Sequence, residues 1–299
     1  MILLATAFVL ARAGIQISQR DRPKLQDYFI YIAFVLFLAM AICDLIGIPQ
    51  VSYIIKSDAD APHTFDEQKP RILFGVRLAF VTTLLFWASL LCVKLSLLAL
   101  YKRLVAGQSR VYIRAWWAVL VFCLVGCIAC MAGHLGGCSD FLSTIKQGTS
   151  CANTRSDRGP EAILYASYAW NVLTDLMIMI LPIRLTWNLR LGLRQKIGLY
   201  ALFASGSICI AIATLRVVQI GSHESGHVKP VSTSLWTAVE ASVAVCIGCT
   251  PAFVAYYRKI QAQGSSDGAH HLDWRGESQS LENSNGADAI KMDVMNVKS

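Results

Sequence analysis

The sequence is poor in charged residues. Only 15% of its 299 residues are Asp, Glu, Lys or Arg, whereas a soluble domain has about 25%. Hydrophobic residues make up 55% of the chain, and the mean hydropathy is +0.49. This composition argues against a water-soluble domain. Although the net charge is +8, no soluble basic domain exists that could bind nucleic acid. A lipid bilayer is the solvent that fits such a chain.

Long apolar runs dominate the sequence. Each of six runs is close to the roughly 20 residues that cross about 30 Å of hydrocarbon. They are Phe29–Ile48, Phe74–Leu100, Ala115–Ala132, Ala162–Leu181, Ile197–Val218 and Leu235–Tyr256. The first residues, "MILLATAFVLARAGIQISQR", contain a shorter apolar stretch that Arg12 interrupts. The runs predict a polytopic, all-α membrane protein.

The charges of the loops decide between a cleaved signal and a first spanning helix. If residues 1–19 span the membrane, basic residues are dense on one side, where the positive-inside rule places the cytoplasm: Arg20, Arg22, Lys24, Lys102, Arg103, Arg110, Arg114, Arg184, Arg190, Arg194 and Lys196. The opposite loops are longer and hold fewer: Lys56, Lys69, Arg71, Lys146, Arg155, Arg158 and Lys229. A cleaved signal would leave six helices and invert this pattern.

We therefore expect a bundle of seven transmembrane helices with the N-terminus outside and the C-terminus in the cytoplasm. The predicted spans lie near residues 1–19, 28–48, 74–101, 115–136, 162–183, 197–219 and 234–257. Arg12 is expected to snorkel toward the cytoplasmic face. Residues 260–299 are rich in Gly, Ser, Asn and charge, which predicts a disordered cytoplasmic tail.

The ten cysteines fall into two environments. Those within the spans include two C-x-x-C pairs, which we interpret as small packing residues rather than a metal or redox site: Cys43, Cys92, Cys123, Cys127, Cys130, Cys209, Cys246 and Cys249. Cys138 and Cys151 lie in an outward loop, "GGCSDFLSTIKQGTSCANT". Because that compartment is oxidising, the sequence predicts a disulfide between them, worth roughly 3 kcal/mol in the chain-entropy model.

A carboxylate interrupts the apolar segment "SYAWNVLTDLMIMILP". A charge in the bilayer costs a few kcal/mol, so Asp175 should face the bundle and have a partner. At 1.5 Å per residue, Asp175 lies about 12 Å from the inner edge, and Lys94 in the third span lies about 10 Å from it. The matching depths predict a Lys94–Asp175 ion pair, with Asn171 one turn further out on the Asp175 face.

Arg216 and Glu240 form a second set nearer the outside, and Asp44 and Arg77 form a third candidate pair at the outer ends of two spans. Two interpretations stay open for these groups. The pairs either hold the helices in register, or they line a polar cavity for a ligand, a substrate or a proton.

One short motif resembles a zinc peptidase site. "SHESGHVKP" contains His223, Glu224 and His227 in an H-E-x-x-H arrangement, which needs a helix to bring both His side chains to one face, and a third ligand. Gly221, Gly226 and Pro230 break any helix there. His134 is the only candidate third ligand that the sequence suggests. We therefore interpret these residues as solvated loop residues and expect no bound metal and no cofactor.

Several segments together resemble the fungal rhodopsin-like family of seven-span membrane proteins. They are "LQDYFIYIAFVL", "VKLSLLALYKRL", the "C…GTSC" loop, "NVLTDLMIMILPIRLTWNL", "KIGLYALFASGSICIAIATLRV" and "LWTAVEASVAVCIGCTPAF". The resemblance covers about residues 1–260. That family includes PTH-type fungal receptors and membrane proteins of satratoxin-type secondary-metabolite gene clusters.

The chain departs from that family and from retinal proteins at specific residues. Gln26 precedes Asp27 where the family commonly has an acidic pair, and the cysteine-rich extracellular domain of some family receptors is absent. No lysine lies between Leu235 and Tyr257 to form a retinal Schiff base, which argues against light sensing. "LYKRL" and "TPAFVAYY" also differ from the D-R-Y and N-P-x-x-Y switches of animal receptors.

Three functional hypotheses follow. The first is a receptor-like, G-protein-coupled-receptor-like sensor whose cavity, ringed by the intramembrane polar residues, binds a small molecule and reports to a cytoplasmic partner. The second is an accessory protein of a secondary-metabolite pathway, or a membrane-embedded enzyme with a buried carboxylate as general acid. The third is a transporter, which the lack of an internal repeat disfavours. We favour a non-enzymatic accessory or sensing protein in the plasma membrane or an endomembrane, with Lys94, Asn171, Asp175, Arg216 and Glu240 as its polar network.

Overall fold

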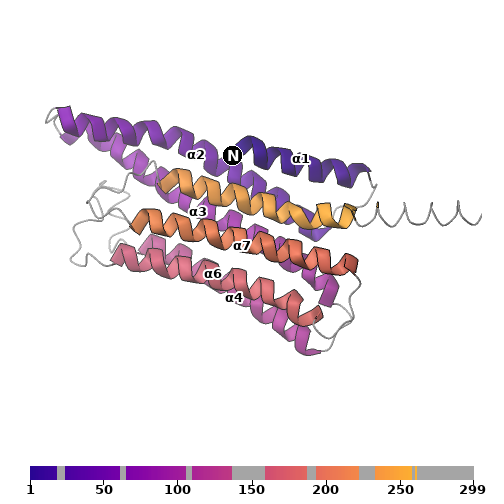
Figure 1. The fold of residues 1–299 in the computed structure, drawn as a ribbon. Coiled ribbons are helices and arrows are strands. Elements are labelled where there is room, and N and C mark those ends of the chain that lie inside the picture. Colours follow the sequence, from indigo (N-terminus) through magenta and orange to yellow (C-terminus); the bar gives the residue numbers. More distant parts are fainter. Residues whose placement is uncertain are drawn as a thin grey trace, which may run out of the picture. The chain divides into compact units, whose positions relative to one another are not determined.

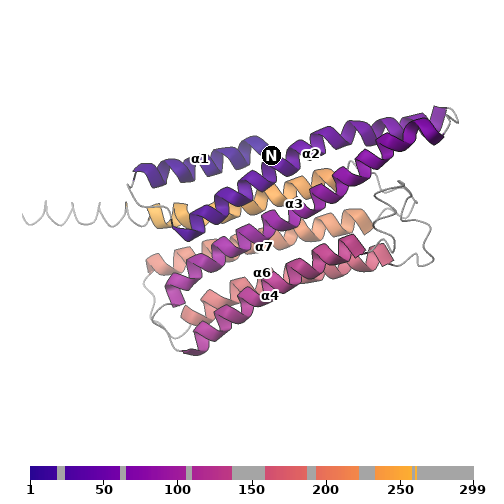
Figure 2. The ribbon, with the colours of Figure 1, turned by 180° about the vertical axis from the view of Figure 1, so that it is seen from behind.

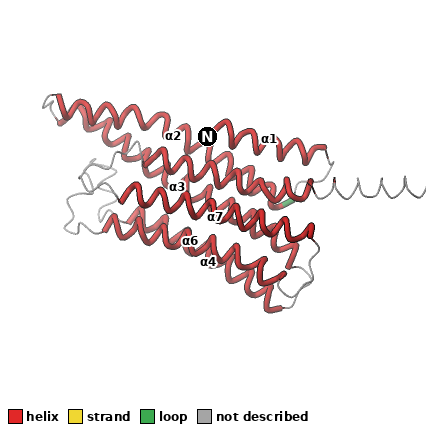
Figure 3. Tube along the Cα trace, in the orientation of Figure 1, coloured by secondary structure: helices red, strands yellow, loops and turns green. Residues whose placement is uncertain are grey.

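A computed structural model describes residues 1–18, 24–60, 65–105, 110–136, 159–186, 193–221, 233–257 and 260. Within these ranges the chain is helical apart from Met1 and Lys24, and it contains no strand (Figure 3). The chain divides into two compact units, Met1–Ala252 and Phe253–Ser299. The helices that pack together belong to the first unit. The described residues of the second are helical residues 253–257 and 260.

Seven helices make up the described residues. They are α1 (Ile2–Ser18), α2 (Leu25–Asp60), α3 (Phe65–Val105), α4 (Arg110–Gly136), α6 (Gly159–Thr186), α7 (Leu193–Gly221) and a last helix, Thr233–Tyr257. Within the first unit, α2 packs along α3 (Figure 1). The view from behind shows α4 beside α6 (Figure 2).

Five of these helices are long and apolar enough to cross a membrane: Leu25–Gly47, Leu73–Lys102, Arg110–His134, Ala162–Arg184 and Thr233–Tyr257. Shorter apolar helices occupy Ile2–Ser18 and Phe203–Gln219. The predicted polytopic, all-α membrane fold is therefore confirmed. That α1 and α7 cross completely, that the N-terminus faces outward and that the C-terminus faces the cytoplasm stay predictions.

The helix ends differ from the ends of the predicted spans. The apolar run near 28–48 lies within a 36-residue helix, and the run near 74–101 lies within a 41-residue helix. Hydropathy marks only the part of a helix that crosses lipid, whereas backbone hydrogen bonds continue through polar residues beyond it.

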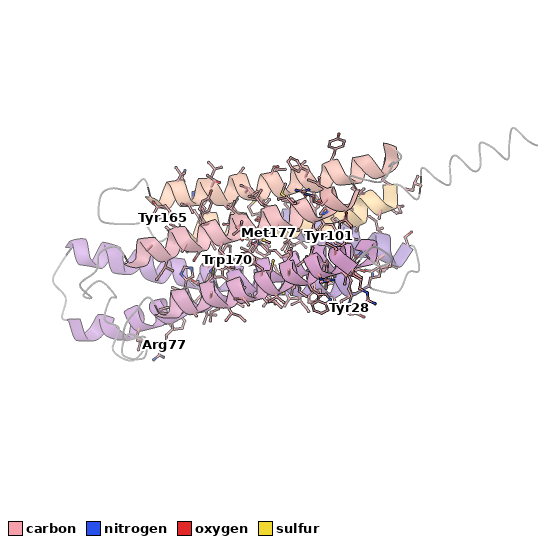
Figure 4. The ribbon with its side chains drawn as sticks, turned by 90° about the horizontal axis from the view of Figure 1, so that it is seen from below. Tyr28, Arg77, Tyr101, Tyr165, Trp170 and Met177 are labelled. Atoms are coloured by element: carbon pink, nitrogen blue, oxygen red, sulfur yellow. The ribbon has the colours of Figure 1, made fainter. Side chains whose placement is uncertain are left out.

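The outer surfaces of the helices are apolar. On α4, Val121, Val125 and Ile128 are 52%, 54% and 66% exposed. Because a helix that is apolar on all sides suits a surrounding lipid phase, these surfaces place the bundle in a bilayer. Tyr28 and Arg77 lie toward opposite ends of the helices that Figure 4 shows.

Small polar side chains tie the helices together. Ser89 Oγ donates to the backbone oxygen of Ala33 at 3.0 Å, and Ser96 Oγ donates to that of Gln26 at 2.8 Å. Trp116 Nε1 donates to the backbone oxygen of Leu98 at 2.8 Å, inside a core shared by α3, α4 and α6. Such contacts replace the hydrophobic drive that lipid does not supply between helices.

Arg12 is buried, and its snorkelling toward the cytoplasmic face stays a prediction. Its side chain is 3% exposed and lies 2.6 Å from Asp27 Oδ1 at the start of α2. Its Nη1 also donates to the backbone oxygen of Gly248 at 2.7 Å. Since a paired, hydrogen-bonded guanidinium avoids the cost of an isolated charge, Arg12 binds α1 to two other helices.

The close contact between α4 and α6 depends on Gly126. Trp170 of α6, labelled in Figure 4, stacks on Phe122 with ring centroids 4.2 Å apart. A Cβ atom at Gly126 would lie 1.4 Å from Trp170 Nε1. The rigid indole therefore occupies the space that the missing side chain leaves.

We predict that Gly126→Ala destabilises the protein by about 1–3 kcal/mol, the usual cost of overpacking. Gly133→Ala is the matched control on the same helix, because its Cβ would meet Ile163 at an ordinary 3.7 Å. Thermal unfolding of the purified variants measures both. Equal melting temperatures for the two variants, or an undiminished effect of Gly126→Ala when it is made in a Trp170→Ala background, would show that the indole does not fill this space.

Candidate functional site

The α6 segment presents a polar face inside the bundle. Asn171, Thr174 and Asp175 are three and four residues apart, so they share one side of the helix. Asn171 is 4% and Thr174 is 1% exposed. The apolar residues between them point elsewhere, which is why one helix can combine a lipid-compatible surface with a polar interior face.

Lys94 of α3 points at this face. Its Nζ lies 2.9 Å from Asp175 Oδ1, and the two side chains are 12% and 15% exposed. The same Nζ donates to Asn171 Oδ1 at 2.8 Å, to the backbone oxygen of Asn171 at 3.1 Å and to Thr174 Oγ1. The side chains expected to pair by depth therefore lie within salt-bridge distance.

A second ion pair joins α7 to the last helix. Arg216 Nη1 lies 3.0 Å from Glu240 Oε2, and the two side chains are 7% and 4% exposed. The Arg216 guanidinium carbon also sits 4.8 Å from the centroid of the Phe86 ring of α3, a cation–π distance. The 3.0 Å contact brings the charges together without hydrogen-bond geometry at Oε2, so Coulomb attraction is its main component.

Asn171 connects the two ion pairs. Its amide oxygen accepts from Lys94, and its Nδ2 donates to Glu240 Oε1 at 3.2 Å. The result is one continuous network across α3, α6, α7 and the last helix, with two cations balancing two carboxylates. We call Lys94, Asn171, Asp175, Arg216 and Glu240 the polar centre.

A cavity of about 50 Å³ borders the polar centre. Four helices line it, and its walls are mostly apolar apart from Lys94, Asn171, Asp175, Ser205, Cys209 and Glu240. A smaller cavity of about 20 Å³ lies on the other side, between α3, α4 and α6. Since one water needs roughly 10–15 Å³ measured in this way, the larger cavity has room for a few waters and not for a drug-sized molecule.

Sequence reasoning missed two parts of this arrangement. Thr174 contributes an oxygen to the Lys94 contact, and its position three residues after Asn171 was a usable signal. The link from Asn171 to Glu240 depends on how the last helix is rotated, which spacing within one helix does not reveal.

The remaining predicted site residues lie outside the polar centre or outside the described residues. Asp44 Oδ2 makes no hydrogen bond within the described part of the chain, and its pairing with Arg77 stays a prediction. His134 Nε2 lies 3.3 Å from Ser167 Oγ. His223, Glu224 and His227, the Cys138–Cys151 disulfide and the tail after Ile260 lie outside the described residues.

The fold and the polar centre define a polytopic helical membrane protein with a charge-balanced interior. The profile of the fungal rhodopsin domain matches residues 11–259, from within α1 to just beyond the last helix. The chain belongs to this family. That the chain does not sense light through retinal stays a prediction from the sequence, which has no lysine between Leu235 and Tyr257.

One similar protein is a "SAT4 family membrane protein" of Emericella nidulans, 30% identical over 90 residues. The match covers 30% of this chain and 22% of that protein, so it spans about a fifth of the relative's length. No solved structure matches.

We predict that Asp175→Asn lowers the free energy of unfolding by about 3–5 kcal/mol, because it leaves the Lys94 charge uncompensated in the bundle. Exchanging the residues, Lys94→Asp with Asp175→Lys, should recover part of that loss. Recovery is partial because the exchanged lysine no longer faces the Asn171 and Thr174 oxygens. Thermal unfolding in one detergent compares the variants, and an exchanged protein no more stable than Asp175→Asn contradicts the pairing.

We predict non-additive effects for Arg216→Met and Glu240→Gln. Each single change leaves one buried charge unpaired, whereas the double variant removes both charges. The double variant should therefore be more stable than the summed losses imply, by about 0.5–3 kcal/mol. A double-mutant cycle measured by thermal unfolding decides this. Additive losses would mean that the two charges do not interact.

Proposed function

We propose that this protein is a non-enzymatic membrane protein that serves a secondary-metabolite pathway as an accessory or sensing component, and that the polar centre is its site of action. The observation that carries the proposal is the single charge-balanced network, which joins four helices beside an internal cavity. Ionisable groups at membrane depth are functional-site candidates by default.

The arrangement of the carboxylates supports a non-enzymatic role. Asp175 and Glu240 each face a cation at 2.9 and 3.0 Å. A general acid must instead reach the atom that it protonates, and the adjoining cavity of about 50 Å³ leaves no space for a metabolite beside either carboxylate. A buried network that joins four helices is better suited to linking their positions.

The pathway assignment is supported by resemblance. Segments across the chain resemble a family that includes membrane proteins of secondary-metabolite gene clusters, and one matching relative is described as a SAT4 family membrane protein. A receptor-like sensor is the second candidate. It is favoured by the connection of four helices through Asn171, because a ligand that displaces Lys94 would change the contact between α3 and α6 on which this connection depends.

The test is a mass-spectrometric metabolite profile of the native producing strain. Strains without the protein, with Asp175→Asn and with Lys102→Ala are compared at matched membrane levels. Lys102→Ala is the control because Lys102 is exposed and lies over the Trp116 ring, outside the polar centre. We expect a discrete intermediate to accumulate in the strain without the protein and in Asp175→Asn, with a normal profile in Lys102→Ala.

An unchanged profile in the strain without the protein, under producing conditions, would overturn the pathway role. The receptor-like candidate would then be tested by its transcriptional response to added metabolites. Accumulation in the strain without the protein but not in Asp175→Asn would keep the pathway role and remove Asp175 from the site of action.

A further inference from the structure

The Lys94 ammonium has more oxygen neighbours than protons to donate. An ammonium carries three N–H donors, yet four oxygens surround Nζ: Asn171 O, Asn171 Oδ1, Thr174 Oγ1 and Asp175 Oδ1. We call these four atoms the oxygen cage. A carbonyl, an amide oxygen, a hydroxyl and a carboxylate are the ligand types that hard cations prefer, and a bare cation needs no directional donors.

Asn171 and Thr174, which supply three of the four oxygens of the cage, are also held by contacts other than Lys94. All four oxygens belong to one turn of α6. Asn171 Nδ2 donates to Glu240 Oε1, which fixes the side of the amide that faces Lys94. The Thr174 hydroxyl donates to the backbone oxygen of Trp170 at 3.0 Å or of Asn171 at 2.8 Å, which leaves its lone pairs for the cage. Lys94 comes from a different helix and supplies only the cation.

We propose that the oxygen cage is a binding site for a small monovalent cation, either Na⁺ or a primary ammonium group, and that Lys94 is its built-in occupant. This inference names a ligand class for the polar centre and is independent of the pathway assignment. In the native chain the occupant is covalently attached to α3. A ligand with an ammonium group must therefore displace Lys94 before it enters.

The two cavities provide the space for such a cation. Lys94 and Asn171 line both the cavity of about 50 Å³ and the cavity of about 20 Å³. Truncating Lys94 removes a wall that the two cavities share. The space vacated lies against the oxygen cage and holds a small cation together with water.

The experiment is chemical rescue of Lys94→Ala. The fluorescently tagged full-length protein is extracted in detergent containing NaCl, methylammonium chloride or tetramethylammonium chloride at equal ionic strength. Size-exclusion chromatography after heating gives the melting temperature. Tetramethylammonium is the reference because it has no N–H donor and is too large for the cage. Lys102→Ala is the matched control on α3, because the Lys102 ammonium lies 5.7 Å from the Trp116 ring centroid.

We expect Lys94→Ala to melt at least about 3 °C higher in NaCl or methylammonium chloride than in tetramethylammonium chloride. The wild type and Lys102→Ala should melt alike in all three salts. A gain in NaCl alone identifies a metal-cation site, and a gain in methylammonium alone identifies an ammonium site. Equal melting of Lys94→Ala in the three salts overturns the proposal.

Lys94→Ala with Asp175→Asn is the second control, because it removes the charge of the oxygen cage together with its occupant. The double variant has no uncompensated charge, so we expect a folded peak with no salt preference. A Lys94→Ala chain that gives no folded peak in any salt contradicts the proposal, whether or not the double variant folds. A salt preference that persists in the double variant also contradicts it, because the cage would then lack its charge.

Discussion

The compensation of the Lys94 charge is the constraint on which the interior of this protein depends. An isolated ammonium in a bilayer has a high free-energy cost. The helix α3, which carries Lys94, must therefore lie where oxygens of α6 can contact the ammonium. Those oxygens come from a single turn, which sets both the height and the rotation of α6 against α3. Asn171 extends the constraint to Glu240, whose partner Arg216 sets α7. Four helices thus take their relative positions from one network.

Packing makes this network achievable. Trp170 lies one residue before Asn171, and its indole fits where Gly126 has no side chain. A bulkier residue there would push α6 away from α4, and with it the polar face that receives Lys94. At the start of α2, Arg12 of α1 contacts Asp27. It also donates to the backbone oxygen of Gly248 in the last helix, so it holds α1 against both helices. Hydrogen bonds to backbone carbonyls and close packing at small residues therefore stabilise the association of these helices, as the hydrophobic effect does for helices in water.

The helices and the Lys94–Asp175 pair could be predicted from the sequence, because the position of a residue along a transmembrane helix gives its depth in the bilayer. The ends of an apolar run mark the edges of the hydrocarbon layer, and a rise of about 1.5 Å per residue then gives the distance of each residue from an edge. Depth was enough to match Lys94 with Asp175. The rotation of each helix about its own axis, relative to its neighbours, cannot be read from the spacing of residues within one helix. Sequence reasoning therefore missed the contact from Asn171 to Glu240. It also named no partner for Arg12, because the partners lie on two helices whose facing sides depend on packing.

The balance of charges bears on what the polar centre can do. Two cations and two carboxylates leave the polar centre with no net charge, so a charged ligand cannot be added there without displacing a resident group or bringing its own counter-charge. Lys94 is the group whose displacement is simplest to accommodate, because its site is formed by α6 alone and cavities lie on both sides of it. Displacing it would remove the ionic contact between α3 and α6, while Arg216 and Glu240 stay paired. The network therefore favours a change at the α3–α6 contact over a general loosening of the bundle.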